Sequence, residues 1–243
     1  MPRPDSPYWT FYAAVAAAQL ADWLPCTAAR VLDLSGCPAF AGQLVAAGHE
    51  VVHVGEHPPD VAGPGRVLPV LAETRSLGWL VADSVDLVLA ESRVLSTCLA
   101  TEETLKHLVR VLRPGGRLLL VVESLALGLA RLADQGRWAE LADVPSADVV
   151  LVPDRDGSVS RCFWPDALRR LLSDAGLEVE WVRPRSVLNV ATVERGLQQG
   201  GPGALRTLVQ TELTLAVERQ GESTGLHLAA SARLAPPQPQ IQR

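Results

Sequence analysis

The feature that most constrains the fold is an alternation of short apolar runs with helix-like segments over residues 30–122. Apolar runs of strand length occur at 30–34, 51–54, 67–70, 85–89 and 118–122. In the segment before the last run, apolar residues recur with the spacing of one buried helix face, at Leu105, Leu108, Val109 and Leu112. Continuous apolar strands that alternate with helices are typical of a parallel sheet covered on both faces. We therefore expect a Rossmann-like, doubly wound α/β fold with a mostly parallel seven-stranded sheet.

Local signals place several element boundaries. The Ala-rich segment 8–24 predicts a helix that ends before Pro25, and Gly48 closes a short helix after the first strand. Thr101 is expected to cap the next helix, and Pro165 to begin a later one that Gly176 ends. Residues 126–150 look helical and then loop-like, and the remaining pattern predicts a strand at 177–182, a helix at 202–219 and a strand at 226–234.

Length and composition favour one domain or slightly more. The chain has 243 residues, of which 48% are hydrophobic and 20% charged, which is ordinary globular composition. We expect an N-terminal arm and cap helix over residues 1–24. The main domain is then expected over 25–235 and a disordered, Pro- and Gln-rich tail over 236–243.

The charge distribution excludes several classes of partner. The net charge is −5, Lys106 is the single lysine, and the arginines are scattered, so no basic stripe is present to neutralise nucleic-acid phosphates. No apolar run approaches the roughly 18 residues of a membrane span. The four cysteines form no CxxC pair and no zinc-finger spacing, which favours reduced thiols, no metal site and a cytoplasmic protein.

The turn after the first strand is the candidate ligand site. Ligands of open α/β sheets bind outside the carboxyl ends of the strands, near the point where the strand order reverses. Here the strand VLDL runs into Ser35, Gly36 and Cys37, and then into a helix. Small residues in this position let backbone N–H groups and the helix N-terminus approach a ligand closely.

Five segments, in order, carry a resemblance to a known family. They are ARVLDL, LVAAGHEVVHVGEHPP, SVDLVLAE, LKHLVRVLRPGGRLLLVVES and WPDALRRLLSDAGLEVEWV. Together these segments resemble the class I S-adenosylmethionine (SAM)-dependent methyltransferases over residues 28–183. The resemblance implies SAM as cofactor and transfer of a methyl group to an O, N or C nucleophile of a small molecule. A second copy of the chain or another protein is left open as a partner.

The resemblance also implies which residues contact the cofactor. Asp33 lies at the end of the first strand, where it would face the cofactor or, alternatively, pin the turn through backbone N–H groups. Gly55 stands where the family has the acidic residue that binds the ribose, and Glu56 follows one place later. The full set of expected cofactor-binding residues is Asp33, Ser35, Gly36, Cys37, Gly55, Glu56, Glu73 and Glu91. The resemblance indicates no catalytic residue.

Departures from the family pattern support a second hypothesis. The family has glycines at alternate positions after the first strand, where this chain has Ser35, Cys37 and Ala39. Glycine suits such positions because it tolerates positive φ and leaves room for a ligand. The alternative is therefore an inactive protein of the same fold that acts as a binding or regulatory partner. A nicotinamide-dependent oxidoreductase is a weaker third candidate, because the turn lacks GxGxxG.

Overall fold

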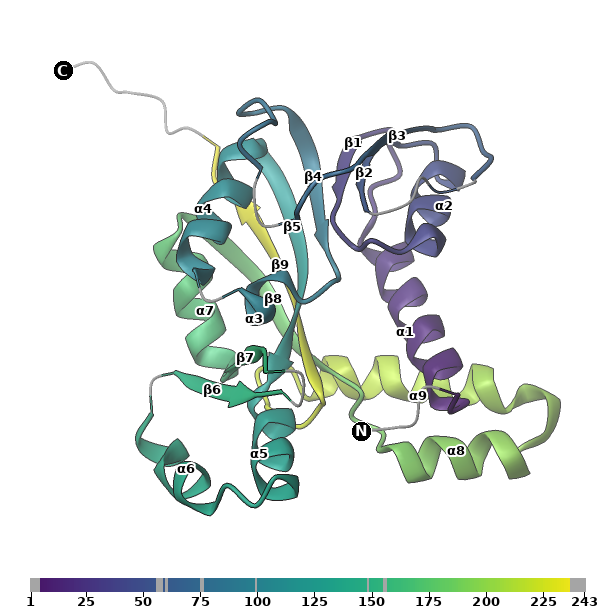
Figure 1. Cartoon of the computed structure of the whole chain (residues 1–243). Coiled ribbons are helices and arrows are strands. Elements are labelled where there is room, and N and C mark those ends of the chain that lie inside the picture. Colours follow the sequence, from purple (N-terminus) through teal and green to yellow (C-terminus); the bar gives the residue numbers. More distant parts are fainter. Residues whose placement is uncertain are drawn as a thin grey trace.

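The computed structural model describes residues 5–55, 59, 61–74, 77–98, 100–147, 149–154 and 157–236. A central sheet runs through the molecule with helices on both faces (Figure 1). The strands are β1 (Arg30–Asp33), β2 (Glu50–Val54), β3 (Arg66–Val70), β4 (Val85–Ala90), β5 (Leu112–Ser124), β6 (Val150–Pro153), β7 (Val159–Phe163), β8 (Leu177–Arg185) and β9 (His227–Leu234). The α-helices are α1 (Tyr8–Trp23), α2 (Pro38–Ala46), α3 (Val94–Thr97), α4 (Thr101–Val111), α5 (Leu125–Asp134), α6 (Trp138–Asp143), α7 (Pro165–Asp174), α8 (Val190–Gln199) and α9 (Ala204–Glu218), and two short 3₁₀ turns lie at Val144–Ser146 and Gly201–Gly203.

The strand order confirms the doubly wound arrangement. Five parallel strands lie in the order β3-β2-β1-β4-β5, and the chain reverses direction across the sheet between β1 and β4. Strand β9 then pairs antiparallel with β5 on one side and with β8 on the other. These seven strands are the expected, mostly parallel sheet. The crevice at the reversal is where such a fold binds its ligand.

The structure also contains elements that the sequence pattern did not predict. A hairpin of β6 and β7 follows the region expected to be helix and loop, and β7 joins the sheet beside the end of β5. Helix α8 precedes the predicted α9. The expected regular alternation of strands and helices is wrong between β3 and β4, where the described residues 71–74 and 77–84 form turns and no helix.

The expectation that Thr101 caps α4 is also wrong. Thr101 is the first residue of that helix, and Ala100 precedes it at the cap position. The Thr101 hydroxyl instead donates hydrogen bonds to the carbonyl oxygens of Leu95 and Cys98, at 3.2 and 2.8 Å. The side chain therefore fastens α4 to the end of α3 rather than closing its own helix.

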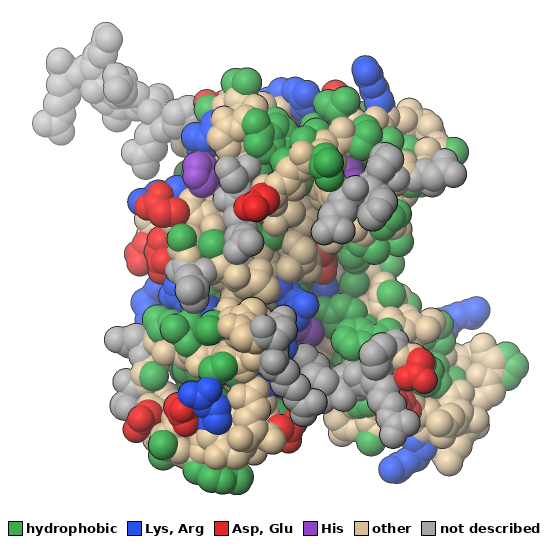
Figure 2. Space-filling view, in the orientation of Figure 1, with side chains coloured by type: hydrophobic (Ala, Val, Ile, Leu, Met, Phe, Trp, Pro, Cys, Tyr) green, Lys and Arg blue, Asp and Glu red, His purple; other side chains and the backbone are tan. Residues whose placement is uncertain are grey.

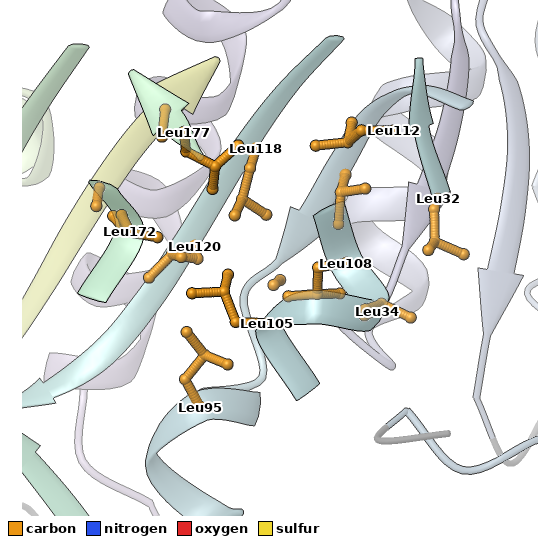
Figure 3. Close-up of a cluster of buried hydrophobic side chains, with 14 of the residues drawn as sticks. Leu32, Leu34, Leu95, Leu105, Leu108, Leu112, Leu118, Leu120, Leu172 and Leu177 are labelled. Carbon is orange, nitrogen blue, oxygen red and sulfur yellow. The ribbon is translucent and has the colours of Figure 1, made fainter. Parts of the chain in front are cut away.

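The two faces of the sheet bury different residues because side chains alternate along each strand. Leu32 of β1 and Leu34, just after it, face α4 and α7, in a cluster that includes Leu105, Leu108 and Leu172 (Figure 3). Val31, the residue before Leu32, faces the other side, where α1 and α2 pack with Leu20 and Leu44. The alternation predicted from sequence thus produces a three-layer α/β/α core.

Helix α1 joins the sheet to the α8–α9 pair (Figure 1). Its first half packs Tyr8, Phe11 and Val15 against residues of α8 and α9. Its last residue, Trp23, lies on the sheet, and the indole Nε1 donates a hydrogen bond of 2.9 Å to Ser231 Oγ in β9. Within the described residues, no helix is long and apolar enough to cross a membrane.

Candidate functional site

A cavity of about 750 Å³ lies at the carboxyl ends of β1, β2, β3 and β4, on the crevice of the strand reversal. This volume is in the range of small-molecule sites, about 300–1,000 Å³. Among the described residues, the walls combine apolar side chains with hydroxyl groups and one carboxylate. The lining residues are Leu34, Ser35, Gly36, Pro38, Val54, Gly55, Leu71, Ala72, Glu73, Thr74, Ser92, Val94 and Thr97.

The turn after β1 forms one wall of the cavity. Gly36 has φ of +62°, and a Cβ placed on it would meet no atom of the described residues within 4 Å. The hydroxyl of Ser35 accepts a hydrogen bond of 3.1 Å from the backbone N–H of Cys37, and Ser92 Oγ donates one of 2.7 Å to the Leu34 carbonyl. These bonds fix the turn in a conformation that leaves the Gly36 backbone open to the cavity.

The side chain of Asp33 stabilises the turn after β1. Its side chain is fully buried, and its Oδ1 accepts a 2.9 Å hydrogen bond from the backbone N–H of Ser35. Its Oδ2 lies 2.7 Å from Nδ1 of the buried His53. Both carboxylate oxygens are thus engaged within the protein. This is the turn-pinning arrangement left open by the sequence.

The His53 side chain leaves little room for a side chain at Gly55, which follows β2. Residues 53 and 55 project from the same side of a strand, and an ideal Cβ on Gly55 would lie 3.0 Å from His53 Nε2 and 3.6 Å from Gly36 Cα. A side chain at this position would push against the histidine and the turn. The absent side chain therefore opens a cradle between the end of β2 and the turn after β1.

The structure brings together half of the predicted cofactor residues. Ser35, Gly36, Gly55 and Glu73 line the cavity. Cys37 is half-buried at the start of α2. Glu56 and the neighbouring His57 lie outside the described residues.

Glu91 was expected to face the cleft, but it is not among the described residues that line the cavity. Its carboxylate forms a two-pronged ion pair with Arg185 at the end of β8, with N–O distances of 2.6 and 2.8 Å. The guanidinium is fully buried, and its Nε donates a 2.7 Å hydrogen bond to Oε1 of Gln19 in α1. Burial by itself lowers the pKa of Arg185, and the adjacent Glu91 carboxylate more than offsets this, so the pKa lies above its usual value.

Arg185 belongs to a row of polar residues at the same edge of the sheet. His227 begins β9 and is paired in register with Glu123 of β5 on one side and with Arg185 of β8 on the other. All three side chains are buried. Neighbouring residues in register project from the same face of a sheet, so the row forms one continuous polar strip.

Two further arginines neutralise Glu123. Arg93, which follows β4, lies 2.7 Å from its Oε1, and Arg131 of α5 lies 2.7 Å from its Oε2. Arg93 has left-handed backbone, with φ of +57°. Its neighbours Ser92 and Val94 line the cavity, so the strip and the cavity share one short segment of chain.

Tyr12 of α1 completes the strip. Its hydroxyl lies 3.3 Å from Nδ1 of His227, the two rings meet edge to face, and the Arg185 guanidinium lies 5.7 Å from the tyrosine ring centre. Burial raises the pKa of Tyr12. Burial, together with the charges of Arg93, Arg185 and Arg131, lowers the pKa of His227 to about 3. Both groups are therefore neutral near pH 7.

The polar strip was not predicted from the sequence. Its members are single charged or aromatic residues at the ends of apolar strands, as in LLLVVE and GLHLAA, and they come from distant parts of the chain. One signal is visible in hindsight, because a charge that ends a fully apolar strand marks a buried, paired group. The space-filling view shows a hollow on the visible face, in which acidic, basic and histidine side chains meet (Figure 2).

A second hollow, of about 800 Å³, lies between α1, α9 and β8. Its two tryptophan rings already make cation–π contacts within the protein. Arg117 lies 5.1 Å from the Trp23 ring centre, and Arg183 lies 4.5 Å from the Trp181 ring centre. It lies away from the strand reversal. The cavity at the carboxyl ends of the strands is therefore the better candidate site.

Comparison with solved structures identifies the fold. No sequence-family model and no curated protein matches the chain. The 1,6-didemethyltoxoflavin-N1-methyltransferase of Burkholderia thailandensis, solved with 1,6-didemethyltoxoflavin and S-adenosylhomocysteine (SAH), matches with a TM-score of 0.58 at 18% identity, over 94% of this chain and 81% of that one. A SAM-dependent methyltransferase of Methanosarcina mazei matches with a TM-score of 0.57 at 17% identity, over 90% and 98% of the two chains.

A third similar structure carries a different activity. The cyclase SpnF matches with a TM-score of 0.52 at 16% identity, over 91% of this chain and 81% of that one. The chain therefore has the fold of the class I SAM-dependent methyltransferases. The sequence-based prediction of that fold is confirmed, and a fold alone does not define the reaction.

Proposed function

We propose that the protein binds SAM in the cavity at the carboxyl ends of β1–β4 and transfers its methyl group to an O, N or C nucleophile of a small molecule. The observation that carries this proposal is the cavity itself, which lies on the strand reversal of a methyltransferase fold and is lined by Ser35, Gly36, Gly55 and Glu73. The similar structures support the proposal because methyltransferases predominate among those described above.

The residues present fit a nucleoside-containing cofactor. Gly36 and Gly55 form a cradle that side chains would fill, with the ideal Gly55 Cβ only 3.6 Å from Gly36 Cα. The cradle exposes backbone groups, and the walls add the Glu73 carboxylate and the hydroxyls of Thr74 and Thr97. Ribose hydroxyls and an adenine ring need such hydrogen-bonding groups beside apolar walls. Among the described wall residues Glu73 supplies an acidic group, and Glu56 stays a candidate for the ribose contact.

Positioning is the main contribution expected from the protein. Bound SAM supplies an electrophilic methyl group on a sulfonium centre. The turn held by Asp33 and Ser35 keeps the Gly36 backbone in place, and the fixed walls orient whatever enters the cavity. Holding two reactants in line lowers the barrier without strong acid–base machinery. This agrees with the described walls of the cavity, which carry one carboxylate and several hydroxyls.

Calorimetric titration of the purified protein with SAM and SAH tests the proposal. We expect saturable binding of both compounds, and a rise in the free energy of unfolding of about 2.7 kcal/mol at 100 times the dissociation constant. A protein that unfolds cooperatively but binds neither compound at millimolar concentration would contradict the proposal. That result would instead favour an inactive member of the fold with a binding or regulatory role.

A further inference from the structure

The strongest unexplained feature outside the cofactor cavity is the Nε2 atom of His227. This atom is buried and has no hydrogen-bond partner among the described residues. The whole residue is only 5% exposed. A buried polar atom without a partner costs about 1–3 kcal/mol, so its persistence calls for an explanation.

The neighbours of His227 define which ring nitrogen carries the proton. The Tyr12 hydroxyl lies 3.3 Å from His227 Nδ1, and the Tyr12 side chain also interacts with the Arg185 guanidinium. A guanidinium has only donors, so the tyrosine proton cannot be given to Arg185 and is directed to Nδ1. His227 is neutral, and when Nδ1 accepts, the proton of the imidazole is on Nε2. The unpartnered atom is therefore an N–H donor.

The surroundings of this donor favour negative charge. The charged groups that act most strongly on His227 are Arg93, Arg185 and Arg131, and all three disfavour a further positive charge on its ring. Arg93 is the most accessible of them, with 39% of its side chain exposed. A ligand oxygen with full or partial negative charge would satisfy the Nε2–H donor and gain from the arginines.

The strip adjoins the proposed cofactor cavity. Val94 and Thr97 of α3 line the cavity, while Ser96 of the same short helix accepts a 2.8 Å hydrogen bond from the backbone N–H of Glu123. The row Glu123–His227–Arg185 therefore lies across a single helical turn from the cavity, at the same edge of the sheet. A small molecule held there would be next to a cofactor in the cavity.

From these contacts we infer that His227 Nε2–H, flanked by Arg93 and Arg185, binds an anionic oxygen of the small-molecule substrate, such as a carboxylate or a phenolate. The assignment of this ligand as the methyl acceptor rests on the proposed function. The donor and its preference for an anion rest on the contacts of the strip alone. His227 is thus a substrate-binding and specificity-determining residue.

NMR of the ¹⁵N-histidine-labelled full chain tests the inference. Two-bond ¹⁵N–¹H spectra report the tautomer, and we expect His227 to be neutral with its proton on Nε2. Sodium benzoate is the anionic probe, and benzamide is its neutral control of similar shape. Benzoate should shift the His227 Nε2 signal saturably, and benzamide should bind about tenfold more weakly.

His49 is a matched internal control. It is also buried with an unpartnered Nε2, and its Nδ1 accepts a 3.1 Å hydrogen bond from the Ala29 backbone, but it lies at the opposite edge of the sheet. Benzoate should leave the His49 signals unchanged. Equal shifts at both histidines, no saturable shift at His227, or a proton on His227 Nδ1 would overturn the inference.

Variants separate a binding role from a structural one. His227→Phe removes the donor and should weaken benzoate binding about tenfold, the effect of one hydrogen bond of about 1.4 kcal/mol. His227→Gln keeps an N–H donor and should recover part of that loss, and Arg93→Gln should weaken benzoate more than benzamide. Equal affinities in His227→Phe and the unmodified chain would overturn the inference.

Titration of the same samples with SAH keeps the two proposals distinguishable. Binding of SAH with no response of His227 to benzoate would remove the anion site and leave the methyltransferase proposal standing. A benzoate response without SAH binding would leave the anion site standing and remove the methyltransferase proposal.

Discussion

Gly36 is the residue on which the proposed cofactor site most depends. Its φ of +62° and the open space around its Cβ position let the backbone border the cavity. We predict that Gly36→Val abolishes or strongly weakens SAH binding, because the new side chain would project into the cavity. Calorimetry measures this directly.

Gly115 provides the matched control for that variant. It has φ of +80°, an equally open Cβ position among the described residues, and a place at the opposite end of β5 from the cavity. Both substitutions carry the same backbone cost, about 1–2 kcal/mol. Gly115→Val should therefore lower stability while leaving SAH affinity unchanged. Equal effects of the two variants on affinity would remove Gly36 from the site.

We expect Asp33 to affect the stability of the protein more than the binding of a ligand. Its two oxygens serve His53 and the Ser35 backbone in a fully buried position. Asp33→Asn should lower the free energy of unfolding by about 1–3 kcal/mol, because an amide offers one acceptor oxygen in place of the two carboxylate oxygens that hold His53 and the Ser35 backbone. Urea unfolding measures the loss.

Glu103→Gln is the control for Asp33→Asn. It removes a carboxylate that pairs with Lys106 on the surface, where 63% of its side chain is exposed. Exposed ion pairs contribute about 0–1 kcal/mol, so this change should be small. A similar loss in both variants would contradict the structural role assigned to Asp33.

Site residues whose contacts are to neighbours in sequence could be predicted, and those whose partners are distant in sequence could not. Ser35 and Gly36 line the cavity because a strand–turn–helix motif places them through neighbours in sequence, and their contact with a cofactor stays a prediction. Glu91 was misplaced because its partner Arg185 lies 94 residues away and nothing near position 91 signals it. The position of Asp33 could be predicted, but its partner His53 required the register of β1 with β2.

At the scale of elements, Glu91 and Arg185 connect the end of β4 to the end of β8. The pair is buried, bidentate and also tied to α1 through Gln19. We predict that Glu91→Gln and Arg185→Met each lower the free energy of unfolding by about 3–5 kcal/mol, because each leaves a buried partner unpaired.

The double variant distinguishes this coupling from general damage. Glu91→Leu combined with Arg185→Met replaces both charges by apolar groups, and its cost should be well below the sum of the single variants. Urea unfolding of all three completes the cycle. Additive losses would mean that the two residues stabilise their elements independently.

Elements with strong periodic patterns were predictable, and those that depend on neighbouring elements were not. Helix α4 begins where it was expected, and β5 contains the expected strand 118–122 but extends from Leu112 to Ser124. The β6–β7 hairpin was missed because its strands are short and half-exposed and join the sheet only at Glu123 and Ser124. Helix α8 was missed although Val190, Val193 and Leu197 recur at helical spacing and pack together against α1 and α9.

At the scale of the whole molecule, the buried histidine makes stability depend on pH. The pKa of His227 is lowered from 6.5 to about 3 by burial and by the charges of Arg93, Arg185 and Arg131, with Tyr12 as its neutral neighbour. The unfolded state therefore binds a proton first as the pH falls. The contribution of His227 to the free energy of unfolding is therefore fully present above pH 6.5 and decreases as the pH falls toward 3.

We predict a loss of about 2 kcal/mol from this residue between pH 7 and pH 5, since each pH unit below 6.5 is worth about 1.4 kcal/mol. His227→Gln should remove this part of the pH dependence, while the part due to His49, whose pKa burial also lowers, should persist. Urea unfolding at the two pH values measures both. An unchanged slope in His227→Gln would contradict the neutral, buried state of His227.

The most direct test of the central claim is hydrogen–deuterium exchange of the protein with and without SAH. We predict that SAH protects the backbone amides around the cavity, at 34–37, 54–55, 71–74 and 92–97, because these segments form its walls. Protection confined to the hollow between α1 and α9, or no protection at saturating SAH, would contradict it.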